Sequence, residues 1–196
     1  MTTRRRGEYA KSAQRRREIV AAAVEVFGER GFREGSLRDI ADRAGITYAG
    51  LRHHFPTKAG LLQAVLRWRE EDSVQRAGPA DGLDLLRAWI ADVENNVKRP
   101  ALVELETVIG AEAISLQHPA HPYFAHLYGY ATELLTRAFT TAAAHGQLRD
   151  GVQPEAAAQI VLAVTVGLQT LWLHDRSVDV PGRLNAAVRG LLTVDL

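Results

Sequence analysis

Residues 36–55 read SLRDIADRAGITYAGLRHHF, and this stretch decides how the first third of the chain folds. Ser36, followed three positions later by Asp39, forms a capping box, which marks the start of a short helix. Gly45 comes after that helix and can adopt the positive φ that a tight turn between two helices requires. The spacing therefore predicts a helix, a glycine turn and a second helix over residues 48–54.

The residues after the glycine fit the second helix. Ile46 supplies an apolar side chain inside the turn, and Thr47 is a good N-cap residue. Leu51 and Phe55 are spaced to bury one face of the helix against its neighbours. This pattern is typical of a helix-turn-helix, whose second helix lies in the major groove of DNA with its N-terminal residues at base edges.

The exposed positions of the second helix carry no acidic side chain, so the helix can approach phosphates without like-charge repulsion. Thr57 and Lys58 start the next helix, and a helix N-terminus beside a lysine is a natural phosphate site. A plain helical hairpin that never contacts nucleic acid is the alternative. The predicted DNA-binding residues are Ser36, Thr47, Tyr48, Gly50, Arg52, His53, His54 and Lys58.

The charge of the chain is distributed unevenly. The net charge is +1, but the first 60 residues carry 13 basic and 7 acidic side chains, against 11 basic and 16 acidic in the remainder. This asymmetry indicates an anionic partner at one end, unless the basic residues only form a solvated face. Arginines 4–6 form either a minor-groove arm or a solvated tail, and arginines 15–17 either contact phosphates or are surface charges.

Composition excludes several kinds of chemistry. The chain has no cysteine, which rules out thiol catalysis, disulfides and cysteine-ligated zinc. It lacks G-x-S-x-G, P-loop, Rossmann and H-E-x-x-H patterns, so we expect no enzyme activity. His118, His121 and His126 have prolines between them and no paired carboxylates. We therefore predict neither a metal site nor a cofactor.

Hydropathy predicts a cytoplasmic protein without a membrane partner. The basic N-terminus is not followed by an apolar stretch, so it does not read as a signal peptide. The longest apolar run covers residues 160–173, which is 14 residues and too short to span a bilayer. This run is expected to be a buried helix.

Helical periodicity dominates the whole chain and predicts an all-α fold of about nine helices. The segment AGPADG at 77–82 is the best linker candidate. We expect a DNA-binding domain over 12–58 and a C-terminal dimerisation and ligand-binding domain over 59–196. The predicted helices cover residues 12–31, 37–44, 48–54, 58–76, 83–99, 101–117, 123–145, 154–174 and 181–194.

The segment IVLAVTVGLQTLWL at 160–173 is apolar almost all round, so its helix must be covered on several sides. One cover is its own domain and another is a second copy of the chain. We expect a homodimer formed through the helices over 154–174 and 123–145. Its two-fold symmetry would match palindromic half-sites about 34 Å apart on operator DNA.

A small-molecule pocket needs apolar walls with a few placed polar groups. Thr165 and Gln169 share one face of the buried helix, where an unpaired amide costs roughly 1–3 kcal/mol. They could instead bond neighbouring carbonyls or a dimer partner. The predicted ligand-binding residues are Trp89, Val93, Glu106, Phe124, Tyr128, Thr165, Gln169 and Trp172.

Residues 15–66 include FGERGFREGSLRDIADRAGITYAGLRHHFPTKAGLLQAVL and resemble the N-terminal domain of the TetR (tetracycline repressor) family. The Gly-Ile-Thr turn followed by His-Phe-Pro-Thr-Lys is a specific signature of that family. The resemblance implies a homodimeric repressor that leaves its operator when a small-molecule effector binds the C-terminal domain. A DNA-binding regulator controlled by protein partners or by its abundance, and an activator, are the alternatives.

The resemblance also implies roles for single residues. Thr47, Tyr48 and Gly50 would face bases or the adjoining backbone, and His54 and Lys58 would hold phosphates. Arg52 stands where the family usually has an aromatic residue, and Gly50 stands where Ser or Thr is common.

Two further segments point to one part of the family. GLRHHFP at 50–56 and HPAHPYF at 118–124 are similar to an actinobacterial-type branch. The chain holds 21 arginines and 3 lysines, which agrees with a GC-rich genome.

Overall fold

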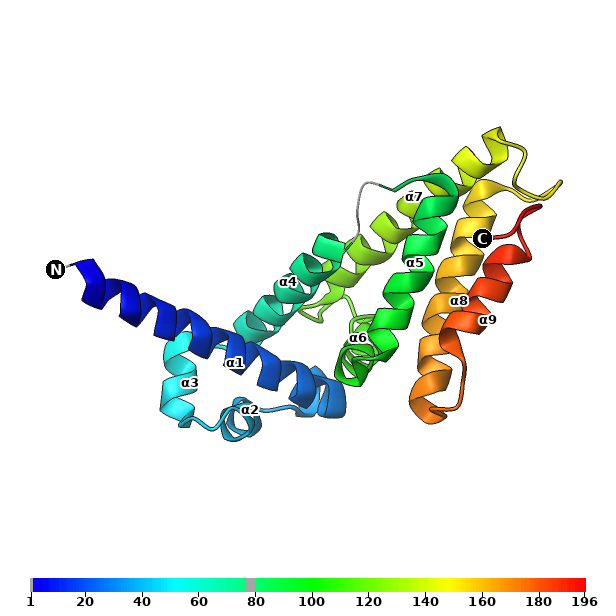
Figure 1. Cartoon of the computed structure of the whole chain (residues 1–196). Coiled ribbons are helices and arrows are strands. Elements are labelled where there is room, and N and C mark those ends of the chain that lie inside the picture. The colour runs from blue at the N-terminus through cyan, green and yellow to red at the C-terminus, as the bar shows by residue number, and fades with distance from the viewer. Residues whose placement is uncertain (1, 77–79) are drawn as a thin grey trace. The chain divides into compact units, whose positions relative to one another are not determined.

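The computed structural model describes the backbone of residues 2–76 and 80–196, and side chains over 11–72 and 80–196. These residues form nine α-helices and no strand, which confirms the predicted all-α fold (Figure 1). Residues 77–79 of the predicted linker and the side chains of arginines 4–6 lie outside the described part. The helices are α1 (Thr2–Glu34), α2 (Leu37–Arg43), α3 (Tyr48–His54), α4 (Lys58–Arg76), α5 (Gly82–Val97), α6 (Pro100–Glu112), α7 (His121–Ala144), α8 (Pro154–His174) and α9 (Val180–Arg189).

The first helix differs from its prediction at both ends. It begins at Thr2, well before Ser12, which is the first residue of the predicted helix. Near its other end the helix breaks at Gly31, whose φ of 73° and ψ of 177° are open essentially to glycine alone. The break frees the next backbone N–H groups, and the carboxylate of Glu112 accepts a hydrogen bond of 2.7 Å from Phe32 N–H. The prediction that the helix ends near Gly31 therefore identified a real break, after which one more turn follows.

Two other helices end earlier than predicted. After α6, the chain from Ala113 to Ala120 makes turns closed by short-range bonds such as His118 N–H to Ser115 C=O at 2.9 Å. After α9, the residues of the tail pair with the segment before α8 and do not continue the helix. Thr193 N–H donates to Gln147 C=O at 2.9 Å beside an isolated antiparallel bridge between Leu148 and Leu192. The residues after α9 pair with a segment about 45 positions earlier, and a local sequence pattern cannot predict such a pairing.

The chain divides into two compact units. The first combines the residues up to 71 with 104–121, and the second combines 72–103 with 122–196. The expected functional division at residue 58 remains a prediction. In the first unit, α1 buries Ile19, Ala23 and Phe27 completely, each four residues from the next, as an amphipathic helix requires. Leu51 of α3, in the same unit, is completely buried as well.

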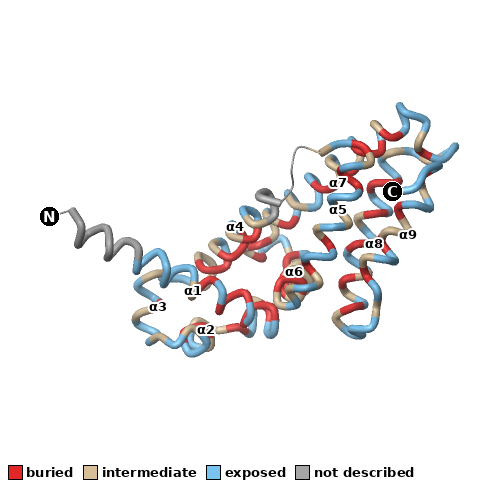
Figure 2. The backbone as a smooth tube through the Cα atoms, viewed as in Figure 1, coloured by how far each residue is buried: buried red, intermediate tan, exposed pale blue. Residues whose placement is uncertain are grey.

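The second unit has its own apolar core. Leu135 and Phe139 of α7, Val161 of α8 and Leu184 of α9 are completely buried in it (Figure 2). Helices α8 and α9 run side by side in this unit (Figure 1). The apolar faces of these helices therefore meet within a single core.

Helix α8 is, within the described residues, long and apolar enough to cross a membrane by length and composition. The apolar run was predicted to be a buried helix because it is too short for a span. One third of the residues in the most apolar window of α8 are buried inside the structure. The buried residues Val161, Thr165, Gln169 and Trp172 recur at intervals of three or four, which is the pattern of a core helix with one covered face.

Replacing Gly31 with alanine tests the importance of the break in α1. An added Cβ would lie 2.5 Å from Glu112 Oε1, and the backbone geometry is strained for any residue with a side chain. We expect Gly31→Ala to lower the free energy of unfolding by about 1–3 kcal/mol, measured by urea denaturation. Gly129→Ala is the matched control, because that glycine lies inside α7 with open space around it. The control should gain about 0.5–1 kcal/mol, and equal effects of the two substitutions would contradict the assignment.

Candidate nucleic-acid interface

The structure has the predicted N-caps of α2 and α3 and the glycine turn between them. Asp39 N–H donates to Ser36 Oγ at 3.1 Å, and Ser36 N–H donates to Asp39 Oδ2 at 3.1 Å, so the capping box is present. Gly45 has a φ of 63°, as the turn requires. Thr47 caps α3 by accepting a hydrogen bond of 3.1 Å from Gly50 N–H.

Helix α3 is anchored from its inner side. Leu51 is completely buried, and Phe55 at the C-cap is 3% exposed. Ile46 is only partly buried, so the turn side chain contributes less apolar contact than a fully buried one would. These contacts hold the helix while its other face remains open to solvent.

The predicted DNA-binding residues all belong to the first unit. Those from Thr47 to His54 lie on α3 or at its N-cap, whereas Ser36 caps α2 and Lys58 begins α4. Tyr48 is 40% exposed, and Thr47, Arg52 and His53 are also exposed. Gly50 and His54 are partly buried. Ser36 is committed within the protein, because its hydroxyl donates to Asp39 Oδ2 at 2.6 Å.

Lys58 is engaged at the end of α1. Its Nζ donates to Arg33 C=O at 3.1 Å and lies 4.7 Å from the centre of the Phe32 ring. These contacts hold the ammonium group against the last turn of α1 and use one of its three donors, so two remain for a phosphate. A phosphate contact is therefore compatible with the position of Lys58.

Two effects disfavour the charged form of His54 and lower its pKa. Burial lowers the pKa of its imidazole, and the nearby charges of His53, Arg16 and Arg15 lower it further. The rings of His53 and His54 meet edge to face, with centres 5.5 Å apart. His54 can therefore offer a hydrogen bond to DNA rather than a full positive charge.

Acidic side chains near the helix-turn-helix are paired with arginines. Arg43 of α2 contacts Glu25 at 2.7 Å and Glu29 at 2.8 Å, both on α1. Arg30 contacts Asp39 at 3.0 Å. Hydrogen bonds from Arg43 lower the pKa of Glu29. These pairs join α2 to α1.

Two arginines at this surface were not among the predicted DNA-binding residues. Arg16 of α1 reaches the end of α3, where its Nη1 donates to His54 C=O at 2.9 Å. The guanidinium of Arg38, in the first turn of α2, lies 5.5 Å from the centre of the Tyr48 ring. The arginine run at 15–17 indicated the first region, but no sequence signal distinguishes Arg16 from its neighbours.

The predicted ligand-binding residues fall in both units. Glu106 belongs to the first unit, where its Oε1 accepts a hydrogen bond of 2.7 Å from Arg69 Nε. The other seven belong to the second unit. Five of these are buried, Trp89 is partly buried and Tyr128 is 38% exposed. The five buried residues are Val93, Phe124, Thr165, Gln169 and Trp172.

The polar members of this group differ in how they are paired. Thr165 Oγ1 accepts a hydrogen bond of 3.1 Å from Trp89 Nε1 and donates to Val161 C=O at 2.8 Å. This is the predicted alternative, in which a polar side chain of α8 bonds within the protein. Gln169 is 9% exposed, and its amide has no hydrogen-bond partner among the described residues.

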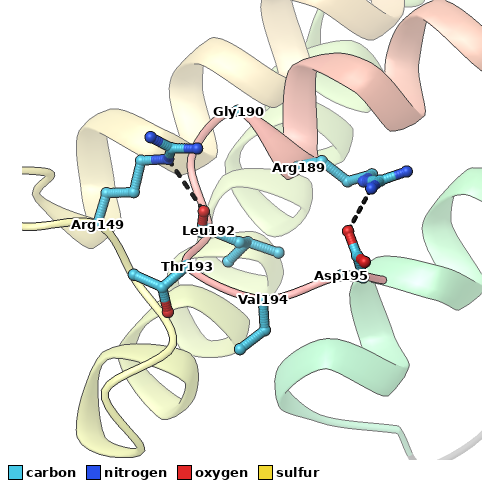
Figure 3. A pocket seen from close by; sticks show the side chains of 7 residues that line it. All are labelled: Arg149, Arg189, Gly190, Leu192, Thr193, Val194 and Asp195. Atoms are coloured by element: carbon cyan, nitrogen blue, oxygen red, sulfur yellow. Dashed lines mark hydrogen bonds and ion pairs between the residues drawn. The ribbon is translucent and has the colours of Figure 1, made fainter.

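A hollow of about 610 Å³ lies in the second unit between the end of α9 and the segment before α8 (Figure 3). Arg149 and Arg189 lie on opposite sides of it. Arg149 Nε donates to Leu192 C=O at 3.0 Å, and Arg189 is paired with Asp195. None of the predicted ligand-binding residues lines this hollow.

Comparison with known proteins places the chain among transcriptional regulators. Residues 19–65 match the family model described as bacterial regulatory proteins, tetR family. Over 174 residues the chain is 26% identical to the HTH-type transcriptional repressor BepR of Brucella suis, covering 84% of this chain and 83% of that protein. Over 72 residues it is 42% identical to the HTH-type transcriptional repressor KstR2 of Rhodococcus jostii, covering 36% of this chain and 35% of that one.

A solved structure shows the same fold. The transcriptional regulator of the TetR family from Agrobacterium tumefaciens superposes with a TM-score of 0.80 at 20% identity, covering 93% of this chain and all of that one. The relatives are regulators and not enzymes, which agrees with the prediction of no enzyme activity. Residues 19–65 thus carry the N-terminal domain of the TetR family, and the whole chain is similar to DNA-binding transcriptional regulators of that family.

Proposed function

We propose that the chain is a homodimeric repressor that binds a palindromic operator and leaves it when a small molecule binds its C-terminal part. The carrying observation is the exposed face of α3, which presents Thr47, Tyr48 and Arg52 without any acidic side chain. In a helix-turn-helix the N-terminal residues of the second helix contact base edges, and surrounding groups contact phosphates. Thr47 and Tyr48 are accordingly the proposed base contacts, with Arg52, His53 and Lys58 on the backbone.

Dimer formation is supported by an uncovered stripe on α8. The stripe contains no charged residue, and its members recur every three or four positions, so they share one face of the helix. A second copy related by two-fold symmetry would cover this stripe and place two copies of α3 on successive turns of DNA. Exposed Tyr128 and Tyr130 make α7 the second proposed contributor. The stripe consists of Ala156, Ile160, Ala163, Gly167 and Leu171.

Effector binding is supported by Gln169. Its side chain is 9% exposed, and a ligand with its own donor or acceptor could bond its amide without displacing a protein group. Gln169 lies one turn after Thr165 and one turn before Trp172 on the buried face of α8. We therefore propose an effector with an apolar body and at least one hydrogen-bonding group. Within a cytoplasmic regulator, such a molecule would release the operator.

Replacing Tyr48 or Lys58 with alanine tests the DNA surface. The probe is a duplex that the wild-type protein selects from a random pool, and binding is followed by fluorescence anisotropy over a range of salt. Each substitution should weaken binding, and Lys58→Ala should also reduce the slope of log K against log salt by about one. Lys98→Ala is the control, because Lys98 is an exposed lysine paired with Glu94 in the second unit. If both variants bind like the control, the assigned surface is wrong.

A glutamate on the α8 stripe tests the dimer. Ala163→Glu places a charge at the centre of the proposed contact, where desolvation would oppose association. Sedimentation velocity should then show a monomer. The affinity for the selected duplex, measured by fluorescence anisotropy, should fall as well. Ala91→Glu makes the same change at an exposed position of α5 and should leave the dimer intact. A dimeric Ala163→Glu protein would place the interface elsewhere.

Removing the amide of Gln169 tests the effector site. A library of hydrophobic and cationic compounds is screened for those that raise the melting temperature of the wild-type protein. We expect Gln169→Leu to lose most of the shift given by the active compounds, because the buried hydrogen bond is gone. Gln159→Leu is the matched control at an exposed position of the same helix. An undiminished shift in Gln169→Leu, or no active compound at all, would contradict the sensor proposal.

A further inference from the structure

The C-terminal end of α3 is attached to α1 by one side chain. Arg16 Nη1 donates to the backbone carbonyl of His54 at 2.9 Å, across 38 positions of sequence. The central carbon of the same guanidinium lies 4.3 Å from the centre of the Phe55 ring. One planar cation therefore contacts both the last residue of α3 and its C-cap residue, all within the first unit.

Helix α3 depends on such contacts because it is short. It has seven residues, whereas isolated helices shorter than about 12–15 residues are marginal in water. The last carbonyls of a helix have no partner within it and carry partial negative charge, so a cation there is stabilising. Phe55 is buried and its N–H donates to Leu51 C=O at 2.8 Å. Arg16 therefore contacts both the last carbonyl of α3 and the buried Phe55 ring that follows it.

The neighbours of Arg16 do something different. Arg15 pairs with Glu18 at 2.7 Å, and Arg17 donates to Gln14 at 2.6 Å, so both bond within α1. Of these three adjacent arginines, Arg16 is the one with a contact to α3 among the described residues. All three side chains are positively charged and exposed, so their contacts are what distinguishes Arg16 from the other two.

We propose that Arg16 is a positioning residue for sequence readout, holding the C-terminal end of α3 so that Thr47 and Tyr48 meet base edges at a fixed angle. This inference rests on the proposed DNA-binding surface. A seven-residue helix is about 10 Å long, so a tilt of about 10° about one end moves the other by about 2 Å. Hydrogen bonds to bases tolerate only a few tenths of an ångström, so release of the helix end reduces recognition of the operator.

A direct phosphate contact is the rival role for the same side chain. Loss of a phosphate contact weakens binding to every duplex equally and reduces the salt slope by about 0.9. Loss of positioning weakens binding to the operator alone, because contacts to phosphates do not need the bases in register. The ratio of operator affinity to non-specific affinity therefore separates the two roles.

The experiment compares Arg16→Ala with Arg15→Ala, which removes the same charge one position away. Each is titrated against a duplex selected from a random pool by the wild-type protein and against a scrambled duplex of equal composition, over a range of salt. For Arg16→Ala we expect the affinity for the selected duplex to fall roughly tenfold below that of Arg15→Ala. The two variants should bind the scrambled duplex equally, with equal salt slopes.

Amide hydrogen exchange gives an independent measurement on the helix itself. The N–H groups of Leu51 and Phe55 donate to Thr47 and Leu51 carbonyls, and both should exchange faster in Arg16→Ala than in Arg15→Ala. Arg16→Lys provides a milder change if the alanine variant does not fold. It keeps the charge and a donor but loses the planar group over Phe55, so the preference for the selected duplex should fall about threefold with the salt slope unchanged.

Three results would overturn the inference. Equal affinities of Arg16→Ala and Arg15→Ala on the selected duplex would show that the contact with α3 has no role in binding. Equal losses on both duplexes with a smaller salt slope would make Arg16 a phosphate contact. A wild-type protein that selects no duplex would overturn the DNA-binding surface itself, and this failure is distinguishable because it appears before any variant is compared.

Discussion

The short length of α3 is the constraint on which the first unit depends. Seven residues make too few internal hydrogen bonds to be stable alone, yet the helix must leave one face uncovered to reach DNA. Its stability therefore comes from three places away from that face. Thr47 caps its start, Leu51 buries its inner side, and Phe55 with Arg16 holds its end. Each contact leaves Tyr48 and Arg52 exposed to solvent, whereas a core helix would have that face covered as well.

The elements behind α3 have to be rigid for the same reason. Helix α2 is as short as α3, and it is joined to α1 by the pairs of Arg43 with Glu25 and Glu29. Exposed ion pairs contribute little singly, but a shared arginine between two carboxylates fixes one geometry. Glu112 adds a contact from α6 at the break beside Gly31. The first unit thus includes residues 104–121, which are distant in sequence. The helix-turn-helix is therefore stabilised by residues outside its own motif.

Local signals predicted the parts of this structure that local chemistry determines. The capping box, the Gly45 turn and the Thr47 cap follow from hydrogen bonds within a few residues, and all of them are present. The limits of α1, α6 and α9 were wrong. Turns follow α6 and a distant pairing follows α9, whereas no contact among the described residues explains the early start of α1. The tail after α9 pairs with residues near Leu148, and α1 continues past Ser12. Arg16 is a similar case within the site. Its neighbours Arg15 and Arg17 are the same residue type, and only the contacts in the structure distinguish the three.

The C-terminal part illustrates why polar residues in apolar helices do not identify a pocket by themselves. Thr165 met the same sequence criterion as Gln169, yet its hydroxyl is fully used by Trp89 and the carbonyl of Val161. Glu106 likewise has a protein partner in Arg69. A group satisfied within the protein gains little from a ligand, since binding would exchange one hydrogen bond for another. Gln169 differs because its amide makes no such bond among the described residues, so a ligand there would not have to displace a protein group. The effector proposal therefore rests on Gln169 and not on the number of polar residues in α8.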